Sequence, residues 1–235
     1  MLLLAAAAQF TLQPHLIADL GYNPFADFVP LSQIVTFDQA LAVNTQIPAT
    51  NLDTLAAWIK ANPQRGFFGS PGEGTGAHLA GLAFGRTFGL ALSHVPYRGT
   101  PAALPELITG RLPMFIASHA ELITSHRRGQ VHILATAGEA RSIYLPNIPT
   151  FREQGVDVVA PGWFAFYAPA GVSRERVSQL EEHIGEAMRL PATKSLAEAL
   201  GFQVSGTSAA ELGRIQREQF DRLGRAVKAS GLAMR

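Results

Sequence analysis

Short apolar segments alternate with amphipathic helical patterns along most of this 235-residue chain. Several apolar stretches have the length and composition of buried strands: 40–43, 66–69, 92–95, 112–116 and 131–136. Between them, apolar side chains recur every three or four residues, which is typical of helices that pack on a sheet. This alternation predicts an α/β protein with mainly parallel strand pairing.

Capping residues mark where several predicted helices begin and end. N-caps are expected at Asn51, Thr150, Ser173 and Ser208. Thr150 would form a capping box with Glu153, and Ser208 would form one with Glu211. A further helix should run from about Ala77 to a stop at Gly89, with Leu79, Leu82 and Ala83 facing inward. Pro191 should open another helix, which Gly201 ends.

The chain opens with an apolar run, Met1 to Ala8, before its first charged residue at Asp19. A secretory signal needs a positive region ahead of its apolar stretch, and this run has none. Eight residues are also too few to span a bilayer. We interpret the run as a buried strand and infer no signal peptide in the chain as given.

Composition narrows the class of protein. Charged residues make up 16% of the chain, and 19 basic residues balance 18 acidic ones to leave a net charge of +1. That balance argues against a nucleic-acid partner, since such proteins use many basic contacts to phosphates. The chain has no cysteine, which excludes disulfide scaffolds, thiolate metal sites and cysteine nucleophiles.

One glycine-rich segment, 69–78, lies between a predicted strand and a predicted helix. Glycines let backbone N–H groups approach a ligand, and a helix start adds unpaired donors and a positive dipole end. Ser70 and Thr75 add hydroxyl groups. The segment matches neither a P-loop nor the dinucleotide fingerprint, so an anion site and an ordinary strand-to-helix turn both remain open.

A second candidate is the turn at 97–100, which follows the strand ending near Val95. Ligands of open α/β sheets bind outside the carboxyl ends of the strands. Tyr97 offers a hydroxyl, Arg98 a guanidinium, and Gly99 and Thr100 offer backbone N–H groups. A surface loop is the alternative interpretation.

Catalytic and metal signals are weak. His119, His126 and His132 have a spacing that fits no compact metal site, and no Gly-x-Ser-x-Gly elbow is present. We therefore expect no metal and no cofactor, and the signal for an enzyme is weak.

Together these segments resemble the Bug family, the solute-binding receptors of tripartite tricarboxylate transporters. The strongest match is Ser70-x-Gly72-x-Gly74-Thr75-x-x-His78, followed by the segment from His94 to Gly99. Further matches lie, in order, at 22–30, 141–150, 163–171 and 227–231. The similarity covers nearly the whole chain.

The resemblance implies a type II periplasmic-binding-protein fold, with two α/β lobes that close on a small carboxylate. Domain I would comprise 1–43 and 163–235, and domain II would be the insert 44–162. The resemblance also implies a periplasmic location and membrane transporter subunits as partners. Its ligand-binding residues would be Ser70, Gly72, Gly74, Thr75, Gly76, His78, Tyr97, Arg98, Gly99 and Thr100.

The family has further strands and a helix ahead of the segment that resembles Met1 to Leu4. We therefore expect domain I to lack its N-terminal elements, with impaired ligand binding and self-association through the depleted lobe. Two alternatives stay open at this point. One is a small α/β hydrolase-like enzyme that uses Ser70 or His78, and the other is a folded remnant that binds nothing.

Overall fold

The computed structural model describes residues 2–230, apart from the side chains of Ala226, Ala229 and Ser230. The chain forms two compact units. Unit 1 comprises the residues up to Thr36 and those from Gly162 onward, and unit 2 is Phe37–Pro161. The first division falls earlier along the chain than the domain boundary predicted after Val43. The resemblance at 227–231 extends past the described residues.

Unit 2 is built on a mixed sheet. Its strands are the second half of β2 (Phe28–Asn44), then β3 (Phe67–Ser70), β4 (Ser93–Pro96), β5 (Met114–Ser118) and β6 (Val131–Thr136). β3 is parallel to both β4 and β5, whereas β2 is antiparallel to β5 and β6.

The prediction of mainly parallel pairing is therefore wrong outside these three strands. Helical crossovers join β3 to β4 and β4 to β5, and such crossovers produce parallel neighbours. β2 reaches the sheet without a crossover from a neighbouring strand, and it runs the opposite way.

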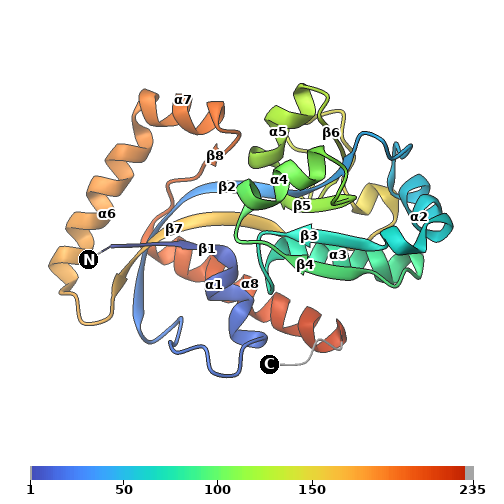
Figure 1. Cartoon of the computed structure of the whole chain (residues 1–235). Coiled ribbons are helices and arrows are strands. Elements are labelled where there is room, and N and C mark those ends of the chain that lie inside the picture. Colours follow the sequence, from blue (N-terminus) through green and yellow to red (C-terminus); the bar gives the residue numbers. More distant parts are fainter. Residues whose placement is uncertain (1, 231–235) are drawn as a thin grey trace. The chain divides into compact units, whose positions relative to one another are not determined.

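Helices cover both faces of this sheet (Figure 1). α2 (Leu52–Ala61) and α3 (Gly76–Phe88) lie on one face, and α4 (Thr100–Ile108) and α5 (His119–Arg127) lie on the other. The first layer buries a core that includes Leu55, Phe68 and Phe84. The second layer buries another, around Leu107 and Phe115. The 3₁₀ turns η2 (Pro63–Arg65) and η3 (Arg152–Gln154) complete the unit.

The predicted ends of these helices are mostly confirmed. The Asn51 side chain accepts a hydrogen bond from the Thr54 N–H at 2.8 Å, so it caps α2. Gly89 ends α3 in the left-handed conformation, with φ of 63°. The Thr150 and Glu153 side chains each accept from the other's backbone N–H, which completes the predicted capping box.

The predicted inward face of α3 is wrong in part. Leu79, Leu82 and Ala83 are only partly buried, although Ala83 does pack against the core. The buried positions are Ala77, His78, Ala80, Gly81, Phe84 and Gly85. Small residues let the helix lie close to the sheet, and Gly81 packs directly on the ring of Phe68. The prediction chose Leu79 and Leu82 and missed the small residues that contact the sheet.

Unit 1 contains β1 (Leu3–Ala6), α1 (Ala7–Thr11), η1 (Gln13–His15) and the first half of β2. After the return crossing it adds β7 (Pro161–Pro169), α6 (Arg174–Arg189), α7 (Pro191–Ala199), β8 (Gln203–Val204) and α8 (Ala209–Ser230). β1 pairs antiparallel with β7, and β8 pairs antiparallel with β2. In its core the ring of Phe10 stacks on Tyr167, with centroids 4.1 Å apart.

The buried strand predicted from Met1 to Ala8 is shorter and less buried than expected, because Ala5 is the one buried residue of β1. β1 ends at Ala6 and α1 begins at Ala7. Alanine is the strongest helix former, and the Gln9 side chain accepts a hydrogen bond from the Ala6 N–H at 2.9 Å. The second half of the apolar run is therefore a helix start.

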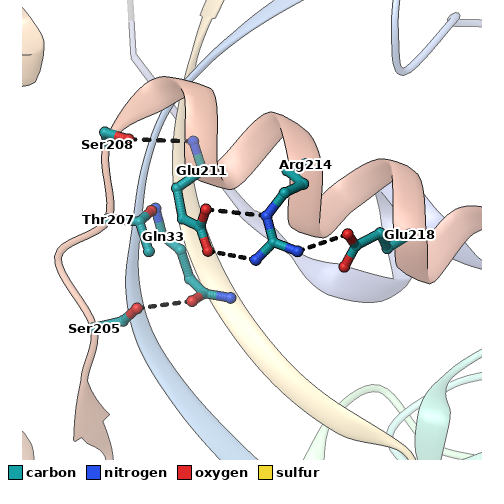
Figure 2. Close-up of polar contacts among 7 residues, drawn as sticks. All are labelled: Gln33, Ser205, Thr207, Ser208, Glu211, Arg214 and Glu218. Carbon is teal, nitrogen blue, oxygen red and sulfur yellow. Dashed lines mark hydrogen bonds and ion pairs between the residues drawn. The ribbon is translucent and has the colours of Figure 1, made fainter.

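A polar cluster fixes the start of α8 (Figure 2). The Ser208 hydroxyl caps the helix by accepting from the Glu211 N–H at 3.2 Å. The Glu211 carboxylate does not complete the predicted capping box, because it pairs with Arg214, which also contacts Glu218. All three charged side chains are largely exposed, so this cluster orders a helix end.

Within residues 2–230, the helices are too short or too polar to cross a membrane.

Candidate functional site

The two predicted ligand segments meet at one edge of the unit 2 sheet. Parallel strands point their carboxyl ends to the same edge, and β3, β4 and β5 end there at Ser70, Pro96 and Ser118. The glycine-rich loop follows β3 and leads into α3. The 97–100 turn follows β4 and leads into α4. Both loops therefore place a helix start beside the same strand ends.

The glycine-rich loop is held by its own hydroxyl groups. Ser70 is fully buried, and its Oγ donates a hydrogen bond to the Gly72 carbonyl at 2.8 Å. The Thr75 hydroxyl donates to the same carbonyl at 2.9 Å and caps α3 by accepting from the His78 N–H. Gly74 has a φ of 65°, which favours glycine. In this structure both hydroxyls therefore shape the loop.

Two stacked histidines contact the glycine-rich loop and hold it in place. The rings of His78 and His94 lie 3.9 Å apart and 16° from parallel. His78 Nδ1 accepts from the Gly74 N–H at 3.2 Å, and His94 Nε2 lies 2.7 Å from the Ser70 Oγ. Since the Ser70 proton goes to Gly72, we assign a proton to His94 Nε2, which donates to Ser70.

Burial, and then the neighbouring His78, lower the pKa of His94 to about 4. A neutral His94 suits a pair of rings in contact, because two imidazolium ions would repel each other. His94 was missing from the predicted site residues. The signal was present, since a parallel β3–β4 pair places His94 beside Phe68 and close to Ser70.

The first turn of α3 offers the site its hydrogen-bond donors. The backbone N–H groups of Gly76 and Ala77 have no hydrogen-bond partner among the described residues. A helix start also carries a partial positive charge. Unpaired N–H groups and a positive end together favour an anion.

In the 97–100 turn, the Tyr97 hydroxyl that was predicted to face a ligand makes a hydrogen bond within the protein instead. The Tyr97 hydroxyl donates to Glu106 Oε2 at 2.8 Å, and burial followed by the Glu106 contact raises the pKa of Tyr97 to about 12. The Tyr97 ring covers Gly69, where a side chain would collide with it. The tyrosine therefore braces the turn against β3.

The remaining residues of this turn lie at the start of α4. Arg98 is exposed and makes no ion pair within the part of the chain that the structure describes. Gly99 has a φ of 87° and provides no side-chain cap to α4. Pro101, in the first turn of α4, has no N–H, so this helix start offers fewer backbone donors than that of α3. Thr100 is buried at 3% exposure.

Other described regions carry weaker evidence of a ligand or metal site. The described residues contain no group of three or more His, Asp or Glu side chains that could hold a metal ion. A hollow of about 550 Å³ lies in unit 1, between the segment 14–25 and Phe220. Asp19 is its one charged residue, and its other lining groups are mostly apolar, so it lacks the converging polar groups of a small-molecule site.

Comparison with known proteins identifies the family. Residues 2–232 match the model of the tripartite tricarboxylate transporter family receptor. The chain belongs to this receptor family. It is 30% identical over 204 residues to the protein BugT of Bordetella pertussis, an alignment that covers 86% of this chain and 62% of BugT. The chain thus spans less than two thirds of that curated relative.

Two solved structures share the fold of this chain. The periplasmic binding protein BugD is 24% identical, with a TM-score of 0.92 over 100% of this chain and 79% of BugD. Rpa4515 of R. palustris, solved with adipate, is 23% identical and also has a TM-score of 0.92, over 100% of this chain and 79% of that one. The predicted periplasmic-binding-protein fold and the Bug family resemblance are confirmed.

Proposed function

We propose that this chain is the solute-binding part of a periplasmic receptor that captures a small carboxylate for a tripartite transporter. Membership of the receptor family supports the class of function. The adipate in the Rpa4515 structure supports the ligand chemistry, because adipate is a dicarboxylate. Transporter membrane subunits would be the partners that receive the ligand.

The unpaired N–H groups of Gly76 and Ala77 are the observation that carries this proposal. A carboxylate oxygen would accept hydrogen bonds from both and would lie at the positive end of α3. The loop from Ser70 to Thr75 would hold these donors in place. Arg98 and the N–H groups at the start of α4 would add a second point of contact from the neighbouring strand end.

The hydrogen-bond polarity at Ser70 argues against the hydrolase alternative. A serine nucleophile must give its proton to a histidine base, whereas the assignment above has the Ser70 hydroxyl donating to the Gly72 carbonyl and His94 Nε2 donating to Ser70. Ser70 is also fully buried, and no carboxylate among the described residues orients His94. We therefore propose a binding protein without catalysis.

A ligand panel tests the proposal. The chain would be titrated with propionate, lactate, succinate, malate and adipate in a calorimeter, with adipamide as the uncharged control. We expect saturable binding of at least one carboxylate and none of adipamide. Binding of no carboxylate would contradict the proposal. Labelling of Ser70 by a fluorophosphonate probe would favour the enzyme instead.

Self-association stays a prediction. β1 lies at one end of the described strand order, and Leu2 and Leu4 are 45% and 54% exposed. Exposed apolar side chains on an end strand favour pairing between chains. Sedimentation velocity should show dimers or larger species, and a single monomeric species at high micromolar concentration would refute this.

A further inference from the structure

Unit 1 has an open apolar hollow that contains none of the candidate ligand-binding residues. It has a volume of about 550 Å³ and lies between the segment 14–25 and Phe220 of α8. Its lining includes the side chains of Ile17, Tyr22 and Phe25, and two of these, Ile17 and Phe25, are 38% and 36% exposed. Protein partners commonly insert an anchoring side chain into a pocket lined by aromatic and other large apolar side chains.

Hydrogen bonds fix the loop that forms this hollow. The Asn23 side chain accepts from the Phe25 N–H at 2.9 Å, and the Asp27 side chain accepts from the Asn23 N–H at 2.7 Å. From α8, the guanidinium of Arg217 lies over the Phe25 ring, 4.8 Å from its centroid. These contacts hold the apolar side chains in place without a partner, so the hollow is preorganised for binding.

Residues 22–30, which include part of this loop, are also one of the segments that resemble the receptor family. The family match covers them, yet they lie in unit 1, whereas every candidate ligand-binding residue lies in unit 2. A transporter receptor has to bind its ligand and also to dock on the membrane subunits that accept it. The candidate site in unit 2 serves the first task, which leaves this loop available for the second.

The charge at the rim of the hollow indicates the chemistry of the partner. Asp19 is its one charged lining residue, is exposed, and makes no ion pair with any residue from 2 to 230. A partner with a Lys or Arg beside its apolar anchor would complement this carboxylate, on the side of the hollow away from Arg217. The same carboxylate disfavours an anionic lipid surface. Two copies of this chain meeting here symmetrically would oppose two hollows and two like charges.

We propose that the hollow is where the receptor docks on a membrane subunit of its tripartite transporter, an inference that rests on the proposed function. An apolar side chain of the subunit enters the hollow and contacts Phe25 and Phe220. A neighbouring Lys or Arg of the subunit pairs with Asp19. One anchoring side chain and one exposed ion pair make a weak contact, which suits a receptor that binds and leaves the transporter in each cycle.

Capture of the chain by nanodiscs tests the docking proposal. One set of nanodiscs would hold the membrane subunits of the transporter, and a second set of the same lipids would be empty. Ala18→Trp fills the hollow and Asp19→Lys reverses its rim charge, and both positions are exposed. We expect Ala18→Trp to abolish capture and Asp19→Lys to weaken it about tenfold or more. Ala192→Trp and Glu186→Lys are the matched controls, since they make the same changes at exposed positions of unit 1 outside the hollow, and they should be captured like the native chain.

Carboxylate affinity separates this inference from the proposed function. Calorimetry should give the same carboxylate affinity for the native chain and for Ala18→Trp, which also shows that the variant folds. If the native chain binds no carboxylate, the proposed function fails and the docking proposal fails with it. If it binds carboxylate but empty nanodiscs capture it equally well, or both hollow variants are captured like the native chain, the docking proposal alone is wrong. A native dimer that Ala18→Trp dissociates in sedimentation would assign the hollow to a second copy and would also overturn the proposal.

Discussion

Gly81→Ala tests whether close packing of α3 on β3 supports the ligand loop. A Cβ at this position would lie 2.7 Å from Cδ2 of Phe68, and closer still to two other atoms of the ring. Phe68 is 1% exposed and its ring lies 5.1 Å from that of His94, so it has little room to move. Overpacking of this kind costs about 1–3 kcal/mol.

The gain in helix propensity offsets about 1 kcal/mol of that cost. We expect a net loss of up to about 2 kcal/mol in the free energy of unfolding, which corresponds to a fall in Tm of up to about 8 °C for a chain of this size. Calorimetric melting and urea denaturation would measure it. We also expect weaker carboxylate binding, because a displaced Phe68 pushes on the histidines that hold Ser70 and Gly74.

Gly213→Ala is the matched control. Gly213 also lies inside a long helix, α8, but the atom nearest to its Cβ position is 3.7 Å away, an ordinary contact. This change should therefore stabilise the protein by up to about 1 kcal/mol. If both alanine variants shift Tm in the same direction and by similar amounts, the steric reasoning at Gly81 is refuted.

Three further outcomes follow from the described contacts. Because the pKa of His94 is lowered from 6.5 to about 4, folding releases a proton between these two pH values. The free energy of unfolding should therefore fall as the pH drops through this window. Urea titrations of a His94→Gln variant should lose that part of the pH dependence. Asn51→Ala removes the cap of α2 and should lower stability by about 1 kcal/mol; a change within error by the same titrations would contradict the capping role. Arg98→Ala should weaken carboxylate binding several-fold in calorimetry, and unchanged affinity would remove the guanidinium from the site, leaving the backbone donors in place.

Local sequence patterns predicted where helices and strands lie better than they predicted which strands pair and in which direction. Asn51, Ser173 and Pro191 mark helix starts that the structure confirms, because capping depends on a few adjacent residues. Strand direction was wrong in part, since pairing depends on connections between distant segments. β8, with only two residues, carries too little apolar pattern to be recognised.

The candidate site shows the same limit. Sequence reasoning predicted the loop and the turn as ligand segments, because glycines beside a strand end are visible in the sequence. It did not include His94, which lies inside a strand and looks like an ordinary strand residue. The structural role of His94 comes from its contacts, since its Nε2 lies beside the Ser70 Oγ and its ring stacks on His78. A single sequence does not record these contacts.

The internal hydrogen bonds of the 70–76 loop bear on how fast a ligand binds. Ser70, Thr75 and His78 already fix the loop through bonds to Gly72 and Gly74. Ordering a mobile loop costs entropy for every residue that becomes fixed, and here that cost belongs to folding and not to association. A carboxylate bound at the start of α3, as proposed, would therefore meet preorganised donors, and its on-rate should be limited by diffusion and desolvation, without a slow loop-ordering step.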